Sequence, residues 1–185
     1  MSKLKWKAGT MLYPLPAVMV SCGDEKEDNI ITVAWTGTIC TDPAMTYVSI
    51  RPERHSYDII KRTGEFVINL TTKALAYQTD FAGVRSGKDI DKFDTLKLTK
   101  EKANEVKCPL IKESPVNIEC RVVEIKELGS HHMFIAEVLC VDVDEKYLDE
   151  TGKFNLEKCE LISYSHGQYY NLGENLGRFG FSVKK

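Results

Sequence analysis

Four side chains with phosphate-binding chemistry crowd into one short stretch of the chain. Ser49 and Arg51 stand at the end of an apolar run, and Arg54 and Ser56 follow closely. A guanidinium can donate two parallel charge-assisted hydrogen bonds to a phosphate, which a lysine ammonium cannot copy. Pro52 favours an extended Arg51 and so ends the run, while a helix beginning near Ser56 would direct unpaired backbone N–H groups to the same place. The cluster therefore predicts a phosphate site.

The alternative interpretation is that both arginines are ordinary surface charges. Arg51 and Arg54 have Glu53 and Asp58 nearby as ion-pair partners, and charged side chains are mostly solvated. The presence of two hydroxyls and a helix start in the same stretch favours the phosphate site.

Short strands must position this cluster, and the sequence predicts them from β-rich runs between turn residues. These runs are Ala17–Cys22, Asn29–Ala34, Met45–Ile50, Phe66–Leu70 and Leu161–Tyr164. From Val116 to Val122 apolar and polar residues alternate, which is typical of a strand with one buried face. The phase breaks at Val123, predicting a bulge near Val122–Val123. A second long strand, Phe134–Asp144, changes phase around Cys140–Val141.

Helical signals are fewer. Tyr57–Arg62 is stopped by Thr63–Gly64, Leu75 to about Phe81 precedes Gly83, and a short turn covers Asp89–Phe93. Two long strands bent by bulges suit a closed or partly closed barrel. The expected fold is mainly β (α+β), a β-barrel with a few short helices, as one domain over residues 1–185.

Composition limits the possible functions. The net charge of −2 and the pI near 6.1 predict neither a nucleic acid nor a membrane as partner, because such binding needs a basic face. The six cysteines have no zinc or disulfide spacing, so we expect reduced thiols. Because the first residues contain no apolar run of the length a signal peptide needs, we expect a cytoplasmic protein.

Several motifs, in order along the chain, resemble one known family. They are Asn29–Gly37, Asp42–Pro43, Ser49–Pro52 with Arg54, Ser56 and Tyr57, Thr63–Leu70, Ser86–Gly87 with Asp91–Phe93, Gly129–His131 with Phe134–Val138, and Leu176–Gly177 with Phe179–Val183. Together they resemble the flavin reductase and flavoredoxin proteins, most closely the flavoredoxin branch. The resemblance implies a homodimeric, FMN-binding split β-barrel.

The resemblance also implies which residues contact FMN. They are Asn29, Thr32, Ala34, Trp35, Thr36, Gly37, Ser49, Arg51, Arg54, Ser56, Asn69 and Leu70, with the phosphate assigned to the Ser49, Arg51, Arg54 and Ser56 group. Three of these residues have plainer interpretations. Gly37 also fits a turn between strands, Trp35 also fits a core filler, and Asn69 also fits a turn former at a strand end.

Two further assignments come from the resemblance. His131 would lie on the nicotinamide side of the flavin, or else be a solvated histidine at a strand start. The next residue, His132, must point to the other face of the strand, so the pair does not predict a metal site. The loop from Asp80 would complete the partner subunit's pocket through Asp91, Lys92 and Phe93, unless it is an exposed loop without a ligand role.

Three functions remain open. The first is an NAD(P)H-dependent flavin reductase, in which NADH or NADPH binds transiently, since the chain has neither a Gly-x-Gly-x-x-Gly fingerprint nor a phosphate-binding P-loop. The second is a flavoredoxin-like carrier that holds FMN tightly and exchanges electrons with a protein partner. The third is a flavin-free binding module on a related barrel, in which the arginine cluster is coincidental.

Overall fold

The protein is mostly β-structure with short helices, as expected from the sequence. The computed structural model describes residues 1–183. The strands are β1 (Leu15–Pro16), β2 (Val18–Gly23), β3 (Asp28–Val33), β4 (Thr36–Cys40), β5 (Met45–Ile50), β6 (Glu65–Leu70), β7 (Lys100–Glu101), β8 (Leu110–Ile111), β9 (Val116–Leu128), β10 (His131–Val143), β11 (Ile162–Ser165) and β12 (Gln168–Asn171). The helices are α1 (His55–Thr63), α2 (Ala76–Val84) and α3 (Lys92–Leu96), with 3-10 turns η1 (Lys73–Leu75), η2 (Glu145–Tyr147), η3 (Leu156–Cys159) and η4 (Phe181–Val183).

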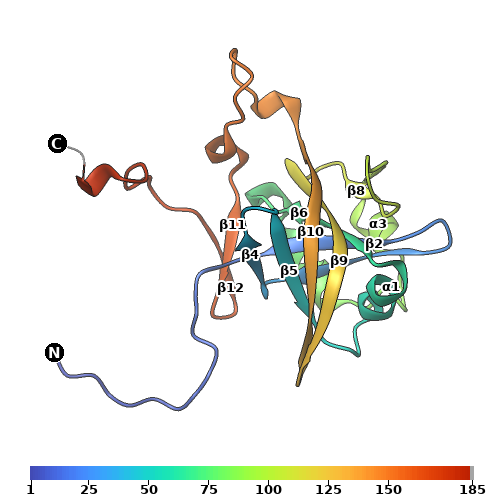
Figure 1. The fold of residues 1–185 in the computed structure, drawn as a ribbon, viewed down its shortest axis with the longest axis horizontal. Coiled ribbons are helices and arrows are strands. Elements are labelled where there is room, and N and C mark those ends of the chain that lie inside the picture. Colours follow the sequence, from blue (N-terminus) through green and yellow to red (C-terminus); the bar gives the residue numbers. More distant parts are fainter. Residues whose placement is uncertain (184–185) are drawn as a thin grey trace.

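Seven strands form one sheet that curves around the core. Its order is β3-β2-β6-β9-β10-β5-β4, with antiparallel pairing throughout. A smaller sheet, β1-β11-β12, stands beside it, and β4 lies close to both in Figure 1. The predicted strands are confirmed with shifts at their ends, and the structure adds β1, β4, β7, β8 and β12. Gly37 pairs with Tyr47 inside β4, so its interpretation as a turn is wrong.

The long β9–β10 ribbon carries two bulges. Ile135 pairs with Glu124 and Ala136 with Val122, which leaves Val123 as the extra residue and confirms the first predicted bulge. The second register shift lies between Val138 and Cys140, one position before the phase change expected from the sequence. Each bulge adds local twist, which lets a long ribbon bend with the barrel wall.

The barrel interior is apolar and holds reduced thiols. Its largest fully buried side chains include Phe66 and Phe134. All six cysteines are free, as predicted. Burial raises the pKa of Cys22 and of Cys120 to about 12, so both stay protonated and apolar at neutral pH.

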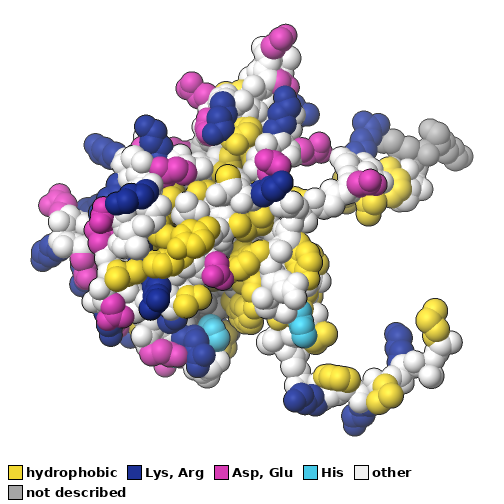
Figure 2. Space-filling model, turned by 180° about the vertical axis from the view of Figure 1, so that it is seen from behind, with side chains coloured by type: hydrophobic (Ala, Val, Ile, Leu, Met, Phe, Trp, Pro, Cys, Tyr) yellow, Lys and Arg dark blue, Asp and Glu magenta, His cyan; other side chains and the backbone are white. Residues whose placement is uncertain are grey.

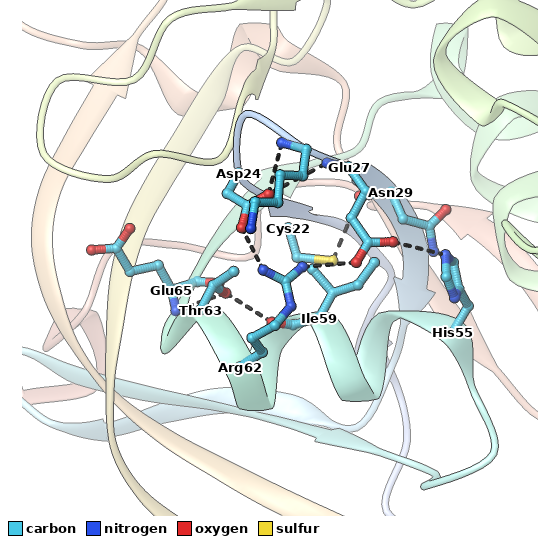
Figure 3. Close-up of polar contacts among 10 residues, drawn as sticks. Cys22, Asp24, Glu27, Asn29, His55, Ile59, Arg62, Thr63 and Glu65 are labelled. Carbon is cyan, nitrogen blue, oxygen red and sulfur yellow. Dashed lines mark hydrogen bonds and ion pairs between the residues drawn. The ribbon is translucent and has the colours of Figure 1, made fainter.

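Helix α1 is fixed at its C-terminal end. At its C-terminus Gly64 adopts the left-handed conformation (φ 71°) and donates its N–H to Ile60 O, as in a glycine C-cap. The Arg62 guanidinium pairs with Asp24 and, at 2.7 Å, with Glu27, both in the β2–β3 turn (Figure 3). Because the helix is a rigid rod, these contacts also fix the position of its N-terminus. Arg51 and Arg54 lie at that N-terminus.

The two ends of the chain extend away from the barrel. Residues 1–12 and the segment after β12 leave on the side of β11 and β12 (Figure 1), and Figure 2 shows hydrophobic side chains on both arms. Leu4, Trp6 and Leu12 on the first arm and Leu176 and Phe179 on the second are exposed. Within residues 1–183, each helix is too short or too polar for a membrane span.

Candidate functional site

A cavity of about 410 Å³ lies where β3, the end of β5, α2 and the β11–β12 hairpin meet. Seven of the predicted site residues line it, namely Thr32, Ala34, Trp35, Ser49, Arg51, Arg54 and His131. Residues 31 to 35 supply one wall, where the chain leaves β3 and turns into β4. The tertiary structure therefore brings together residues that span about one hundred positions in the sequence.

A smaller cavity of about 150 Å³ adjoins the first. Both are lined by Ile31 and Arg54, so Arg54 stands between them. The smaller cavity is rich in hydrogen-bond donors. Its polar lining comprises Asn29, Arg54, His55, Ser56, Arg85, Ser86 and Lys92, with Glu53 as a carboxylate. We call it the phosphate cavity, because three cations and two hydroxyls are a donor set for a phosphate.

Arg54 and Ser56 are placed by the start of α1. Arg54 is the N-cap residue, and its guanidinium donates to Gly83 O at the end of α2. Ser56 is fully buried, and its Oγ accepts from Asn29 Nδ2 at 2.9 Å. The nine-residue helix α1 also turns its free N–H groups toward the phosphate cavity, which favours an anion there.

Lys92 is buried beside the phosphate cavity of its own subunit, which the sequence did not indicate. Its side chain is buried, and Nζ donates to Ile30 O at 2.6 Å and to Ala82 O at 2.7 Å. Burial, together with the nearby Arg54, lowers the pKa of Lys92 to about 8. An ammonium has three N–H donors, so one remains for a ligand in the phosphate cavity.

The expected contribution of Lys92 and Phe93 to a partner's pocket is corrected, whereas that of Asp91 stays a prediction. Lys92 serves the cavity of its own subunit, and Phe93 is 3% exposed in the core beneath α3. Asp91 caps α3, its carboxylate accepting from Asp94 N at 3.0 Å. Helix α3 begins at Lys92, three residues after the start of the expected turn at Asp89, and the side chains of Lys92 and Phe93 are buried in its first turn.

The two arginines differ in environment. The Arg51 side chain is 55% exposed and its Nε lies 2.8 Å from Glu53 Oε1. The surface-pair interpretation thus describes Arg51, although this residue also borders the larger cavity. Arg54 is half-buried, and its hydrogen bond to Gly83 O holds its guanidinium at the site. The guanidinium group on which the phosphate cavity depends is therefore that of Arg54.

Aromatic rings form another wall of the larger cavity. Trp35 stacks on His131 with centroids 6.0 Å apart and planes within 5°, and Tyr164 lies beside Trp35 at 6.4 Å. Partial burial and the charge of Arg51 lower the pKa of His131, so its imidazole is neutral at pH 7. His132 faces the other side of β10, where Nδ1 lies 2.8 Å from Tyr57 Oη.

Four predicted contact residues lie outside both cavities. They are Thr36, Gly37, Asn69 and Leu70. Thr36 is buried in β4 and its hydroxyl donates to Tyr47 O. Gly37 also lies in β4, while Leu70 and the buried Asn69 lie in β6. The Asn69 amide donates to Met19 O and Ser21 Oγ and accepts from Ile111 N and Asn117 Nδ2. Since a polar network inside the barrel uses both its amide groups, we withdraw the assignment of Asn69 as a flavin contact.

Asp80 and Tyr169 were missed by the sequence analysis, and both line the larger cavity. Burial and the Asp80 carboxylate raise the pKa of Tyr169 to about 12, so this phenol keeps its proton. Asp80 comes from α2 and Tyr169 from β12. Only the packing of α2 against the hairpin reveals the pair, because no local pattern links two such distant positions.

A group of potential metal ligands elsewhere is explained by the fold. Atoms of Glu119, Cys140 and Asp142 lie within 4.8 Å of one another on β9 and β10. The fully buried Glu119 carboxylate already accepts three backbone N–H groups, from residues 104, 105 and 106. Its role is thus to hold that loop against the barrel.

A comparison with protein families decides what kind of barrel this is. The model described as "Flavin reductase like domain" matches residues 10–173. The chain belongs to this family. Flavoredoxin of Desulfovibrio vulgaris (Miyazaki F) is 32% identical, with a TM-score of 0.91 over 99% of this chain and 100% of that one. Flavoredoxin from Methanosarcina acetivorans is 25% identical, with a TM-score of 0.90 over 100% and 98%.

A curated relative without a described function is also similar. It is a protein of Archaeoglobus fulgidus, 36% identical over 89% of this chain and 88% of its own length. These comparisons confirm the family resemblance and the flavin reductase type of split-barrel fold. In this family member the phosphate cavity adjoins the larger, aromatic cavity. The donors of the phosphate cavity suit the phosphate end of a flavin nucleotide, and the aromatic cavity suits its ring.

The environment of His131 yields a test of the cavity electrostatics. Replacing Arg51 with Ala removes a positive charge that disfavours the imidazolium, so the pKa of His131 should rise toward its ordinary value. An NMR titration of the imidazole resonances measures this shift. Arg121→Ala, which removes the same charge from β9, should leave the His131 titration unchanged. An equal shift in both variants, or none in either, would contradict the proximity of Arg51.

Proposed function

We propose that this protein binds FMN and acts as an NAD(P)H-dependent flavin reductase. The observation that carries the proposal is the adjacency of the phosphate cavity and the aromatic cavity, joined at Arg54. A flavin mononucleotide has the same order of parts, an anionic end, a polyhydroxyl chain and a flat ring. We place the protein in the cytoplasm and treat residues 1–185 as a single domain.

The phosphate would be held in the phosphate cavity. Arg54, Ser56 and Lys92 would donate to its oxygens, together with N–H groups at the start of α1. Ser49 and Arg51, which line the larger cavity, would face the sugar chain. The four residues predicted for the phosphate, Ser49, Arg51, Arg54 and Ser56, thus all remain flavin contacts. The phosphate itself is assigned to Arg54 and Ser56 with the addition of Lys92, and no longer to Arg51.

The ring would lie in the larger cavity along residues 32 to 35. Backbone N–H and C=O groups there suit its polar edge, and Trp35 with His131 offers a flat apolar flank. The bound flavin supplies hydride and electron transfer. The chain itself would hold the cofactor, keep His131 neutral beside it and leave one side open, so that a nicotinamide can approach and dissociate.

The phosphate assignment predicts the effect of a double variant. Arg54→Ala with Ser56→Ala should weaken FMN binding by about 100-fold or more, because charge-assisted hydrogen bonds are worth roughly 1.5–3 kcal/mol each. Titration of the apoprotein by flavin fluorescence measures the affinity. Riboflavin has no phosphate, so its weaker affinity should be equal in the variant and the parent. Unchanged FMN affinity would remove the phosphate from this cavity.

The second candidate is a flavoredoxin-like electron-transfer protein. It is favoured by the similarity to two flavoredoxins over nearly the whole chain. In this case FMN would be held tightly, and electrons would come from a partner protein rather than from a pyridine nucleotide.

The two candidates differ in how the flavin is reduced. We expect anaerobic NADH or NADPH to bleach the flavin absorbance of the FMN-loaded protein, which stopped-flow spectrophotometry follows. The dithionite-reduced sample provides the fully bleached reference. A spectrum that persists with both nucleotides but bleaches with a reduced protein donor would favour the carrier instead. A protein that stays colourless after FMN reconstitution would leave only the flavin-free binding module.

We also propose that the protein is a homodimer. Both arms are extended in the single chain, and Leu176 and Phe179 are 88% and 106% exposed. An arm with such side chains gains stability from covering a second subunit, at roughly 25 cal/mol per Å² of apolar area buried.

Removal of the C-terminal arm tests this assignment. Deleting residues 172–185 should shift the protein from dimer to monomer, because the apolar contacts of the arm are lost. Sedimentation velocity gives the oligomeric state, and circular dichroism reports whether the barrel stays folded. The variant Glu174→Gln alters the same arm without removing an apolar side chain and should remain dimeric. A deletion variant that sediments as a dimer would argue against the arm.

A further inference from the structure

A buried carboxylate away from the flavin site holds one loop against the barrel. Glu119 in β9 is fully buried, and its two oxygens accept three backbone N–H groups, from residues 104, 105 and 106, at 2.7, 2.6 and 2.9 Å. These residues belong to the loop between β7 and β8, which lies beside β9 in Figure 1. Because such donors stabilise the ionised form of a carboxyl group, Glu119 is the anion of this contact.

A second carboxyl group takes part in the same contact. A carboxylate oxygen of Asp142 in β10 lies within 4.8 Å of one of Glu119. Asp142 Oδ1 accepts from Asn104 Nδ2 at 2.6 Å, so Asn104 donates to both carboxyl groups, once from its backbone and once from its side chain. Asp142 Oδ2 is buried and, within residues 1–183, has no hydrogen-bond partner. A buried oxygen without a donor is costly as a carboxylate, but it can carry a proton.

No cation neutralises these two carboxyl groups. In the part of the chain that the structure describes, no ion pair includes Glu119 or Asp142. The nearest cations along the chain are engaged in other pairs, namely Arg121 with Glu65 and Lys146 with Asp144. The other ionisable groups on the loop and on the two strands are Lys102 and Lys107, both exposed, and Glu105, Cys108, Cys120 and Cys140. Two anions this close repel unless one of them holds a proton.

We propose that Asp142 and Glu119 share one proton and form a pH-sensitive clamp on the loop of residues 104–106. The clamp is closed while Asp142 is protonated and loosens when Asp142 ionises. It lies outside both cavities of the flavin site, so the proposal goes beyond the proposed function and does not depend on it.

The shared proton belongs on Asp142 Oδ2. Glu119 already accepts three N–H groups, which favour its ionised form, whereas Oδ2 of Asp142 has no donor. A protonated carboxyl group is a hydrogen-bond donor, so Asp142 can donate to the Glu119 carboxylate. When Asp142 ionises, repulsion between two carboxylates replaces this hydrogen bond. Glu119 is then held less firmly, and so is the loop that depends on it.

The direction of the pH effect follows from the environment of Asp142. Burial and the hydrogen bond to Glu119 raise the pKa of Asp142 above its ordinary value. The closed clamp therefore holds this proton more tightly than the loosened loop does. Its contribution to stability is complete below the ordinary pKa of an aspartate, and it is lost as the pH rises through the raised pKa.

A loosened loop would uncover a separate apolar cluster. Ala103 and Val106 of the loop pack there with Cys108, Leu110 and Val67. Cys108 is fully buried, and burial raises the pKa of its thiol. Because the thiolate is the reactive form and needs access to a reagent, Cys108 is protected while the clamp is closed. Its reactivity therefore reports on the state of the clamp.

The first measurement locates the proton in the full-length protein. Carbon-13 NMR of the side-chain carboxyl groups follows Asp142 and Glu119 separately as the pH changes. We expect Asp142 to lose its proton above the ordinary range of an aspartate, while Glu119 stays ionised. Titration of Asp142 within its ordinary range would overturn the shared proton and the clamp with it.

Amide hydrogen exchange tests whether the proton controls the loop. The protection factors of amides 104–106 should fall by about 10-fold or more across the titration of Asp142. The reason is that a tenfold difference in proton affinity between the closed and the loosened state changes their ratio by the same factor. Protection that stays constant across this titration would overturn the clamp.

The variant Asp142→Asn mimics the protonated side chain, because its amide can donate to Glu119 and still accept from Asn104. It should keep the protection of the three amides at every pH. Above the pKa of Asp142, its Cys108 should react with iodoacetamide about 10-fold more slowly than that of the parent, as mass spectrometry measures. The control Glu137→Gln removes an exposed carboxylate from the same strand and should behave as the parent does. A pH dependence in Asp142→Asn equal to that of the parent would overturn the proposal.

Discussion

The structure around the site depends on a lysine ammonium held inside the protein. Lys92 Nζ joins Ile30 O of β3 to Ala82 O of α2, while its own backbone begins α3. An unpaired buried charge would cost several kcal/mol. Two carbonyl acceptors reduce that cost, and they lock three elements together. The lowered pKa shows that compensation is incomplete, which leaves the ammonium ready for an anion.

Arg54 completes this arrangement from the other side of the same helix end. Its guanidinium binds Gly83 O, next to the Ala82 O that Lys92 uses. The last carbonyls of a helix carry the negative end of its dipole, so two cations here are stabilised before any ligand arrives. Helix α2 thereby holds Arg54 and Lys92, two of the three cations of the phosphate cavity, while α1 presents its positive end.

The arrangement also explains why one barrel can carry both a flat aromatic site and an anion site. The aromatic wall comes from Trp35, where β3 turns into β4, and from His131, where β10 begins. The anion site comes from helices packed on the first half of β3, where Asn29 and Ile31 line the phosphate cavity. Because β3 borders both, the spacing between the two sites is set by a rigid strand.

Local sequence determined much of the scaffold. Alternation over Val116–Val122 and its break at Val123 predicted the strand and its bulge, and Gly64 predicted the end of α1. These features follow from the two-residue period of a strand and from the freedom of glycine at positive φ, which neighbouring residues are enough to decide. The concentration of Arg and Ser around Pro52 likewise marked the region of the phosphate cavity.

Only the tertiary structure decided which groups form the site. Lys92 was expected to reach a partner but serves its own cavity, Asn69 was expected at the flavin but lies inside the barrel, and Asp80 and Tyr169 gave no signal. Each of these roles depends on contacts between residues far apart in the chain. Whether a polar group is satisfied or free is a property of its neighbours in space, and those neighbours appear only when sheet and helices pack together.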